Sequence, residues 1–303
     1  MIRLIWMFIF LFYSVWAQDA DSLLVGKAIP DSLDAGHDIA LPDSGVQFVD
    51  TLKSHSDSLG QTSHSYLVDS TRLGEPPVFR TLTNSAFRIG EYLEFDIAYK
   101  FITAGTATMS IPDTQWVENR PCYHIVTTAE SNAFFSSFYK VRDRVESFID
   151  MQGLFPWKFE KHIHEGRYKA NRSVRYDQMN RRVYGHKDTL DVSPYIQGVL
   201  SSFYFVRTLP LEVGKSIDIE NYGDGKVYPL RILVHRKEKV KVPAGKFKCI
   251  VIEPVLKTEG IFNQTGKLTI WLTDDERKIP VLMKSKIMVG SIDCRLTKIG
   301  QKR

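Results

Sequence analysis

The residues best suited to hold a metal ion stand together at His162-Ile163-His164-Glu165. In a β-strand, His162 and His164 project from the same face, and two such imidazoles can share a Zn²⁺ ion beside a carboxylate. The sequence offers no third ligand at a characteristic spacing. Four basic residues surround the segment: Lys158, Lys161, Arg167 and Lys169. We therefore expect a solvated strand face here, and no metal or other cofactor.

A second acidic cluster, Asp274-Asp275-Glu276, could bind Ca²⁺ or act as a pair of acids. It falls between two expected strands, so a polar hairpin turn explains it without a function. The sequence contains no Gly-x-Ser-x-Gly elbow, phosphate-binding glycine loop, dinucleotide fingerprint or His-Glu-x-x-His motif. We assign no catalytic residue and expect a binding protein and not an enzyme, although a nucleophile assembled from distant strands remains open.

The strongest functional feature is a basic run from Lys158 to Lys187, with nine basic and three acidic residues. A cationic strand face attracts anions. We expect it to bind an anionic lipid or glycan through four residues: Arg167, Lys169, Arg172 and Arg175. The alternative is an ordinary soluble face, covered in part by the chain's own acidic segment.

One segment has helical periodicity. Ser193-Pro194 is typical of a helix N-terminus, and apolar residues recur after it at helical spacing: Ile196, Val199, Leu200 and Phe203. This predicts a helix near 195–206 that packs in or over a curved sheet. A shorter helix or an aromatic loop is expected at Asn132–Tyr139. If a cavity lies beneath the longer helix, Leu200 and Phe203 would line it and bind a ligand.

Arg207 follows the apolar face of the expected helix. A buried guanidinium needs a carboxylate, and Glu91 or Asp143 could supply one. Arg207 could instead bind an anionic ligand, so it is also a candidate binding residue. We favour the structural pair.

The rest of the chain after residue 85 has the period of two that is typical of β-strands. Tyr92–Phe101 alternates apolar and polar residues, and Glu238–Ile252 forms a hairpin around Pro243-Ala244-Gly245. About a dozen strands of this kind predict a mainly β fold in one domain, 84–303. A strongly curved antiparallel sheet, as a half-barrel or barrel, would hide most of its edges, and a two-sheet sandwich is the alternative.

The N-terminal part differs in composition. Residues 1–17 have the basic, apolar and small-residue regions of a signal peptide, which predicts export to the periplasm or the extracellular space and no membrane span after cleavage. A retained anchor is the alternative. Residues 18–83 are rich in Asp and Ser and are expected to be a disordered acidic linker. From Arg80 onward the chain has 36 basic and 25 acidic residues, and export makes nucleic acid an improbable partner.

Several short segments resemble, in order and spacing, the DUF3108 family of exported bacterial proteins. Among the segments that carry the resemblance are Gly90-Glu91-Tyr92-Leu93, Ala104-Gly105-Thr106-Ala107, Val141-Arg142-Asp143-Arg144-Val145-Glu146-Ser147, Val242-Pro243-Ala244-Gly245-Lys246-Phe247 and Trp271-Leu272-Thr273-Asp274-Asp275. The resemblance covers about residues 87–298. It implies a secreted β-rich domain, similar to curved sheets that carry lipids or lipoproteins, and it implies no activity.

Three functions therefore stay open. The first is non-enzymatic binding of an anionic amphiphile, lipid or glycan, in or on the curved sheet. The second is a structural module with a filled core that binds another envelope protein. The third, an unrecognised hydrolase, would need acidic, His or Ser side chains to converge in one cleft.

Overall fold

The structure, a computed structural model, describes residues 79–256, 267–287 and 290–301. The expected signal segment and nearly all of the expected linker lie outside these residues. The described residues of the β domain begin before Asn84. The Phe79 ring lies 5.4 Å from that of Phe155 and 5.5 Å from that of Trp157, and Leu82 N donates to Gln152 O at 2.8 Å.

Sixteen strands occur in the described ranges, more than the dozen expected. The first half of the domain contains β1 (Glu91–Tyr99), β2 (Ile102–Ser110), β3 (Thr114–Val117), β4 (Arg120–Ser131), β5 (Arg142–Asp150), β6 (Pro156–Glu165), β7 (Tyr168–Asp177), β8 (Arg182–Tyr184) and β9 (Thr189–Asp191). The second half contains β10 (Gln197–Gly198), β11 (Ser216–Gly223), β12 (Lys226–Val242), β13 (Gly245–Leu256), β14 (Leu268–Thr273), β15 (Pro280–Lys286) and β16 (Ser291–Gln301). The unexpected strands are the short ones, β3, β9 and β10.

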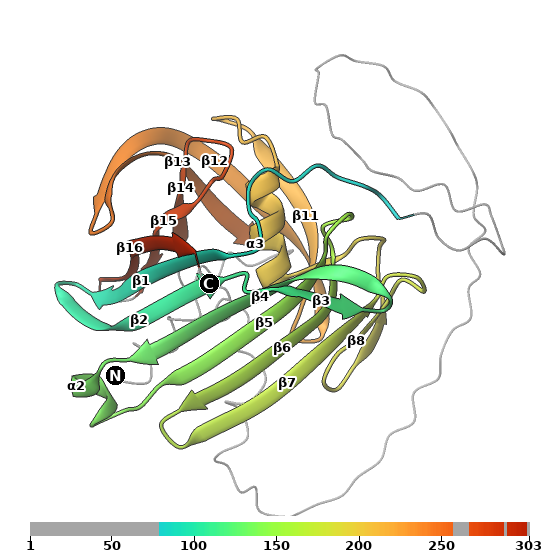
Figure 1. The fold of residues 1–303 in the computed structure, drawn as a ribbon, viewed down its shortest axis with the longest axis horizontal. Coiled ribbons are helices and arrows are strands. Elements are labelled where there is room, and N and C mark those ends of the chain that lie inside the picture. The colour runs from blue at the N-terminus through green and yellow to red at the C-terminus, as the bar shows by residue number, and fades with distance from the viewer. Residues whose placement is uncertain (1–78, 257–266, 288–289, 302–303) are drawn as a thin grey trace, which may run out of the picture. The chain divides into compact units, whose positions relative to one another are not determined.

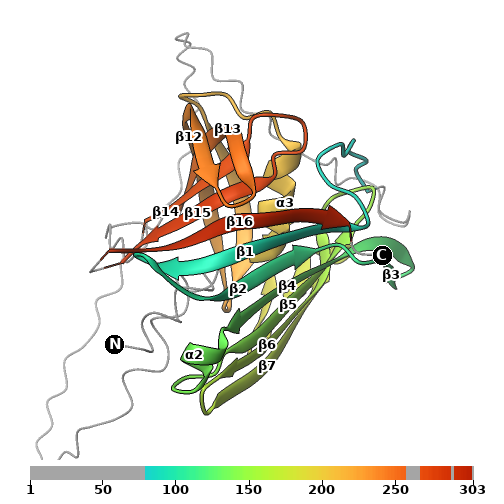
Figure 2. The ribbon, with the colours of Figure 1, turned by 60° about the vertical axis from the view of Figure 1, so that its left-hand side comes forward.

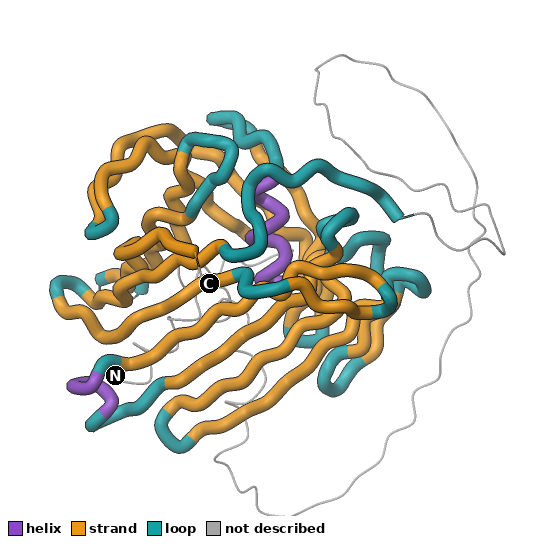
Figure 3. Tube along the Cα trace, in the orientation of Figure 1, coloured by secondary structure: helices purple, strands orange, loops and turns teal. Residues whose placement is uncertain are grey.

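All sixteen strands belong to one mainly antiparallel sheet (Figures 1 and 2). Its order is β10-β11-β12-β13-β14-β15-β16-β1-β2-β4-β5-β6-β7-β8-β9, and β3 pairs with β4 beside this path. The sheet curves around the helix α3 (Val199–Thr208), which lies on its concave side, as the tube in Figure 3 shows. Large twisted sheets tend to curl in this way. The expectation of a curved antiparallel sheet with one packed helix is confirmed.

The helix starts later than its sequence pattern indicated. Tyr195 has a φ of 61°, and Gln197–Gly198 pairs as β10 with Asn221 and Tyr222, so the backbone before Val199 is not helical. Gly198 N donates to Ser201 Oγ at 2.8 Å, which satisfies an amide at the true N-terminus. The aromatic segment forms the one-turn helix α2 (Ala133–Ser136). Among the described residues, no helix has the length and hydropathy needed to cross a bilayer.

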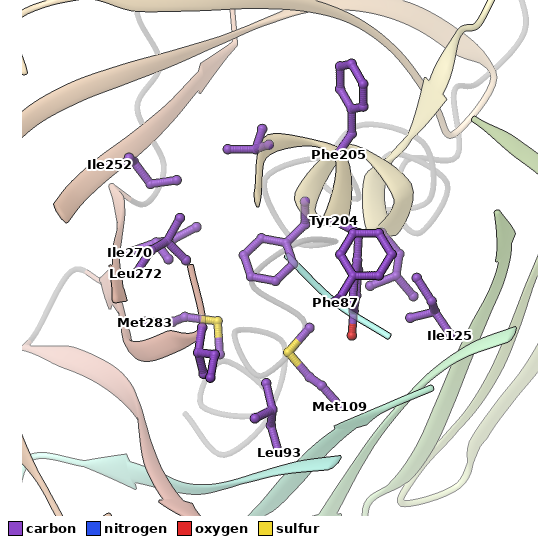
Figure 4. Close-up of a cluster of buried hydrophobic side chains, with 14 of the residues drawn as sticks. Phe87, Leu93, Met109, Ile125, Tyr204, Phe205, Ile252, Ile270, Leu272 and Met283 are labelled. Carbon is purple, nitrogen blue, oxygen red and sulfur yellow. The ribbon is translucent and has the colours of Figure 1, made fainter. Parts of the chain in front are cut away.

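The concave side of the sheet is filled by apolar side chains of the helix and the strands. Leu200 and Phe203 are each 4% exposed and belong to one continuous buried cluster. Figure 4 shows Phe87, Tyr204 and Met109 close together in this cluster. The three cysteines, Cys122, Cys249 and Cys294, are free and buried.

The two edge strands, β9 and β10, do not pair with each other, so the sheet is not closed by backbone hydrogen bonds. Side chains join the two sides instead. Gln197 Nε2 donates to Leu154 O at 3.0 Å, and Tyr222 OH donates to Asp188 Oδ1 at 2.7 Å. These contacts join β10 to the turn between β5 and β6, and β11 to the turn between β8 and β9.

Because Leu200 packs in this core, Leu200→Ala should lower the free energy of unfolding by about 2 to 5 kcal/mol. Chemical denaturation measures the change, with the exposed Val213→Ala as the control. A loss below about 1 kcal/mol would mean that Leu200 lines an open cavity and does not pack.

Candidate functional site

The basic face expected on β6 and β7 is divided by the sheet. Arg172 projects from the same face as the buried Phe159, and its Nη1 lies 3.7 Å from Asp224 Oδ1. Lys169 and Arg175 project from the other face, and Arg167 lies in the exposed turn between the strands. These four residues therefore do not form one continuous cationic surface.

Arg175 is also engaged by its neighbours. Its Nη1 lies 3.6 Å from Asp177 and 3.7 Å from Glu118, and its guanidinium stacks 4.2 Å from the centre of the Tyr184 ring. Leu200 and Phe203 pack in the core, as described above. The expected binding residues are thus distributed over the outer face, the inner face and the core.

The outer face of β5 and β6 holds the group best able to bind a metal. Glu146, Glu160 and His162 each bring one ligand atom within 4.8 Å of the others, whereas His164 is not part of the group. Both carboxylates already face cations, because Arg144 bonds Glu146 and Lys158 Nζ lies 2.9 Å from Glu160. Burial alone would raise the pKa of Glu146, but its bonds with Arg144 and His124 outweigh burial and lower the pKa.

On the inner face, Asp143 is 2% exposed and accepts a hydrogen bond from His164 N at 2.7 Å. Burial raises its pKa from 3.8 to about 6, despite the opposing effects of His164, Lys161 and Glu165. Burial also lowers the pKa of Lys161. The sequence analysis named Asp143 only as a possible partner for Arg207, because alternation in a strand does not show how deeply a polar residue lies or which residues it meets.

The most buried charge is Arg207, at the end of α3, with 0% of its side chain exposed. Its Nη1 and Nη2 donate to the two oxygens of Glu91 at 2.8 and 3.0 Å. Its Nη2 also donates to Ala86 O at 3.1 Å, and both Nε and Nη2 donate to Arg277 O. Arg207 therefore forms a structural pair, and of the two carboxylates expected it pairs with Glu91 and not with Asp143.

Arg277 is positioned by the turn at Asp274-Asp275-Glu276. Asp275 Oδ1 accepts hydrogen bonds from Thr273 Oγ1, Arg277 N and Lys278 N at 2.7 to 3.1 Å. Asp274 pairs with Lys237 at 2.8 Å. The acidic cluster thus builds a polar hairpin turn, as expected.

Two adjoining hollows lie above this ion pair. One, of about 230 Å³, is lined by Arg88, Glu91, Arg277, Ile299 and Gly300. The other, of about 290 Å³, is lined by Asn84, Ser85, Ala86, Phe87, Arg88 and Arg277. The two share Arg88 and Arg277, and we call them together the arginine pocket.

Charge in the arginine pocket is unbalanced. Glu91 is its carboxylate, and it is already bound by Arg207 and, at 3.3 Å, by Arg277 Nη2. Within the described ranges, no ion pair engages the exposed Arg88. Ile299, which is 39% exposed, provides an apolar wall. The pocket therefore has the charge and shape to accept an anionic group next to an apolar one.

The loop before β1 shapes this pocket. Asn84 Oδ1 accepts from Ala86 N and Phe87 N at 3.0 and 3.3 Å, and Gly90, with a φ of 89°, turns the chain into β1. The sequence analysis did not predict Arg88 and Arg277, which are 189 residues apart. The available signals were Arg88, three residues before Glu91, and the Arg277-Lys278 pair after the acidic turn.

A second basic surface lies on the β12–β13 hairpin. Lys239 is directly opposite Lys248, and Lys241 is directly opposite Lys246, and all four are exposed. Directly opposed like charges destabilise a strand pair. None of the four lines the hollows described above.

Removing one partner of the buried ion pair should be costly. We expect Arg207→Met or Glu91→Leu to lower the free energy of unfolding by about 3 to 5 kcal/mol, because each leaves a buried charge without its partner. The double substitution should recover much of the loss. A double-mutant cycle by chemical denaturation tests this, and additive losses would contradict the pairing.

Asp143 should make stability depend on pH. The folded protein holds this proton more tightly than the unfolded chain, so the stabilisation is complete near pH 4 and is lost as the pH rises to about 6. Asp143→Asn keeps the acceptor for His164 N and should remove this dependence, making the variant more stable above pH 6 by up to about 3 kcal/mol. Urea unfolding across this range, with the exposed Asp191→Asn as control, measures it. Equal slopes in wild type and Asp143→Asn would contradict the assignment.

Comparison with solved structures finds five similar chains, three of which are described here. A β-barrel-like protein of the domain of unknown function DUF1849 from Brucella abortus is 10% identical, with a TM-score of 0.49, over 71% of this chain and 99% of its own. A candidate lipoprotein from Parabacteroides distasonis is 7% identical, with a TM-score of 0.33, over 73% and 99%. A candidate exported protein with a YmcC-like fold from Bacteroides fragilis is 12% identical, with a TM-score of 0.29, over 74% and 100%.

No curated protein matches the chain. A family model does, and it covers residues 94–297, from β1 to β16. This is about two thirds of the sequence and almost all of the sheet. The chain therefore belongs to the DUF3108 family of proteins of unknown function.

Proposed function

We propose that this chain is an exported, non-enzymatic protein that binds an anionic lipid, with the acidic head group held in the arginine pocket. The observation that carries the proposal is the pair of guanidinium groups, Arg88 and Arg277, that line both hollows around a carboxylate that is already neutralised. Guanidinium groups bind phosphate and carboxylate through paired hydrogen bonds.

The apolar surroundings favour a lipid over a glycan. Ile299 lines the pocket and is 39% exposed, and Ile89, next to Arg88, is 43% exposed. Apolar side chains of this size would cover the first methylene groups of an acyl chain. A sugar would instead need polar partners around the arginines.

Packing of the concave side supports a surface site. Ile196, Leu200 and Phe203 are buried against the strands and each is at most 4% exposed. A ligand beneath the helix would have to displace them, at a cost of several kcal/mol per side chain. An alternative function, a protein-interaction module, is favoured by this same filled core, since such a module needs no internal cavity.

Export is the remaining part of the proposal. It rests on residues 1–17, which have the charge, apolar stretch and small residues of a signal peptide. Two similar chains are described as a candidate lipoprotein and a candidate exported protein. The N-terminus of the protein recovered from the producing cells, determined by mass spectrometry, tests cleavage after Ala17.

The binding test uses calorimetric titration of the purified protein with a short-chain phosphatidylglycerol and with its phosphatidylcholine counterpart. We expect binding of the anionic lipid, and a loss of about tenfold or more in affinity in Arg88→Gln/Arg277→Gln, because two charged hydrogen-bond donors are removed. The matched control is Arg182→Gln/Arg231→Gln, which changes two surface arginines paired with Asp191 and Asp218.

Equal losses in both double variants would mean that binding follows net charge and not the arginine pocket. If the protein binds an acidic polysaccharide through Arg88 and Arg277 but does not bind the lipid, the ligand of the pocket is a glycan and not a lipid. No binding of either probe would leave the interaction module as the better reading.

A further inference from the structure

Large apolar side chains are exposed at the end of the sheet opposite the arginine pocket. Strand β1 runs from Glu91, in the pocket, to Tyr99, and its nine residues span about 30 Å. Beyond Tyr99, exposed side chains project from three neighbouring connections. They are Phe101 (98% exposed), Ile102 (58%), Phe134 (68%), Phe138 (70%) and Tyr168 (46%). We call these five residues the aromatic rim, which lies at the left-hand ends of β1, β4 and β6 in Figure 1.

The three connections are fixed to one another. Asn132 Nδ2 donates to Thr103 O at 2.8 Å and Asn132 N donates to Ala104 O at 3.0 Å, which joins α2 to the start of β2. Gly166 N donates to Lys140 O at 2.8 Å, which joins the β6–β7 turn to the segment after α2. The aromatic rim is therefore one surface and not three independent loops.

The aromatic residues around α2 divide into two pairs with different roles. Phe135 and Tyr139 pack with the buried Ala104 and Val141 and hold the segment in place. A side chain at Gly166, where φ is 60°, would come within 2.7 Å of the Tyr139 ring. Phe134 and Phe138 have most of their surface in solvent and contact each other at 5.5 Å between ring centres, and Phe134 also contacts the Phe135 ring at 5.3 Å. The packing of Phe135 and Tyr139 thus fixes the segment in a position that leaves Phe134 and Phe138 exposed.

Basic residues surround the aromatic rim. Those that are exposed are Lys100, Lys140, Arg142, Arg167 and Lys169. Among the described residues at this end, the acids are Glu130, which lies directly opposite Arg142 on the neighbouring strand, the partly buried Glu165, the buried Asp143, and Asp293, which lies opposite Ala98 and pairs with Lys284. Cations thus outnumber exposed acids around the apolar side chains.

We propose that the aromatic rim docks this protein onto the surface of an anionic phospholipid bilayer. Phenylalanine and isoleucine side chains at loop tips can enter the boundary between head groups and acyl chains, where tyrosine is also favoured. Lysine and arginine beside them are attracted by anionic head groups. The exposed apolar patch suits the acyl-chain region of such a surface, and the cations that border it suit the anionic head groups.

Charge also argues against a second copy of this chain as the partner. Docking two rims against each other would bring like charges together, which opposes association. A projecting rim of loop tips also lacks the groove that usually receives a peptide. An anionic bilayer offers negatively charged head groups and an apolar interior to the whole aromatic rim.

Vesicle flotation of the purified protein tests the proposal, using phosphatidylcholine vesicles with and without phosphatidylglycerol. We expect binding to the anionic vesicles, and a loss of about tenfold in the partition coefficient for Phe134→Ser/Phe138→Ser. Trp116→Ser is the matched control, because Trp116 is 70% exposed on β3 and is not part of the aromatic rim.

The charge component is tested by Lys100→Gln/Arg167→Gln. The partition coefficient of this variant onto anionic vesicles should fall by about tenfold or more, because each of the two cations removed makes a similar favourable contribution to binding at such a surface. Its binding to phosphatidylcholine vesicles should not change. Lys239→Gln/Lys241→Gln on the β12–β13 hairpin is the control with the same charge change, and it should bind as the wild type does. Far-ultraviolet circular dichroism confirms that each variant is folded.

Insertion is measured by a separate readout. Phe134→Trp should gain fluorescence that brominated phosphatidylglycerol quenches, relative to the wild-type background. The proposal is overturned by absence of binding to anionic vesicles, by equal losses in the Trp116 or Lys239 controls, or by no added quenching at position 134. A concentration-dependent dimer that the Phe134→Ser/Phe138→Ser variant abolishes would overturn it in favour of self-association.

This test is separable from that of the arginine pocket. Phe134→Ser/Phe138→Ser should retain the wild-type affinity for short-chain phosphatidylglycerol in the calorimetric titration, because its substitutions lie at the other end of β1 from the pocket. Flotation lost in Arg88→Gln/Arg277→Gln, and retained in the rim variants, would mean that vesicle binding occurs through the pocket.

Discussion

The buried pair of Arg207 and Glu91 is the interaction on which the structure around the arginine pocket depends. It joins the end of α3 to the start of β1, and the further hydrogen bonds of Arg207 reach Ala86 and Arg277. Three segments distant in sequence are thus held around one guanidinium. Desolvation of both ions opposes this arrangement, so the additional carbonyl partners matter as much as the carboxylate. The arginine pocket exists because this cluster holds Arg88 and Arg277 close together.

The filled concave side limits where recognition can occur. A curved sheet around a helix could enclose a ligand-binding cavity on its concave side. In this protein, packed apolar side chains of α3 and the strands occupy that space. Polar groups on the inner face, such as Asp143, are buried at a cost that appears in their pKa. The side chains able to meet a partner without unpacking the core are therefore those at strand ends and in connecting turns.

The sequence predicted most of the long elements. Clean alternation identified β1, and a Pro/Gly turn between alternating strands identified β12 and β13. The four-, three- and two-residue strands β3, β9 and β10 have too few residues for any period to show. The helix start was misplaced because Ser193-Pro194 imitates an N-terminus, whereas pairing with β11 keeps the chain extended until Gly198.

The candidate site was less accessible to prediction, for a related reason. Glu91 was named as a partner for Arg207 because a buried guanidinium requires a carboxylate, which is a local chemical demand. The approach of Arg277 to Glu91 joins residues 186 positions apart and depends on the sheet order. Alternation places Lys169 and Arg175 on one face of β7, but Arg172 was added to the same binding set although it lies an odd number of residues from both and so projects from the opposite face.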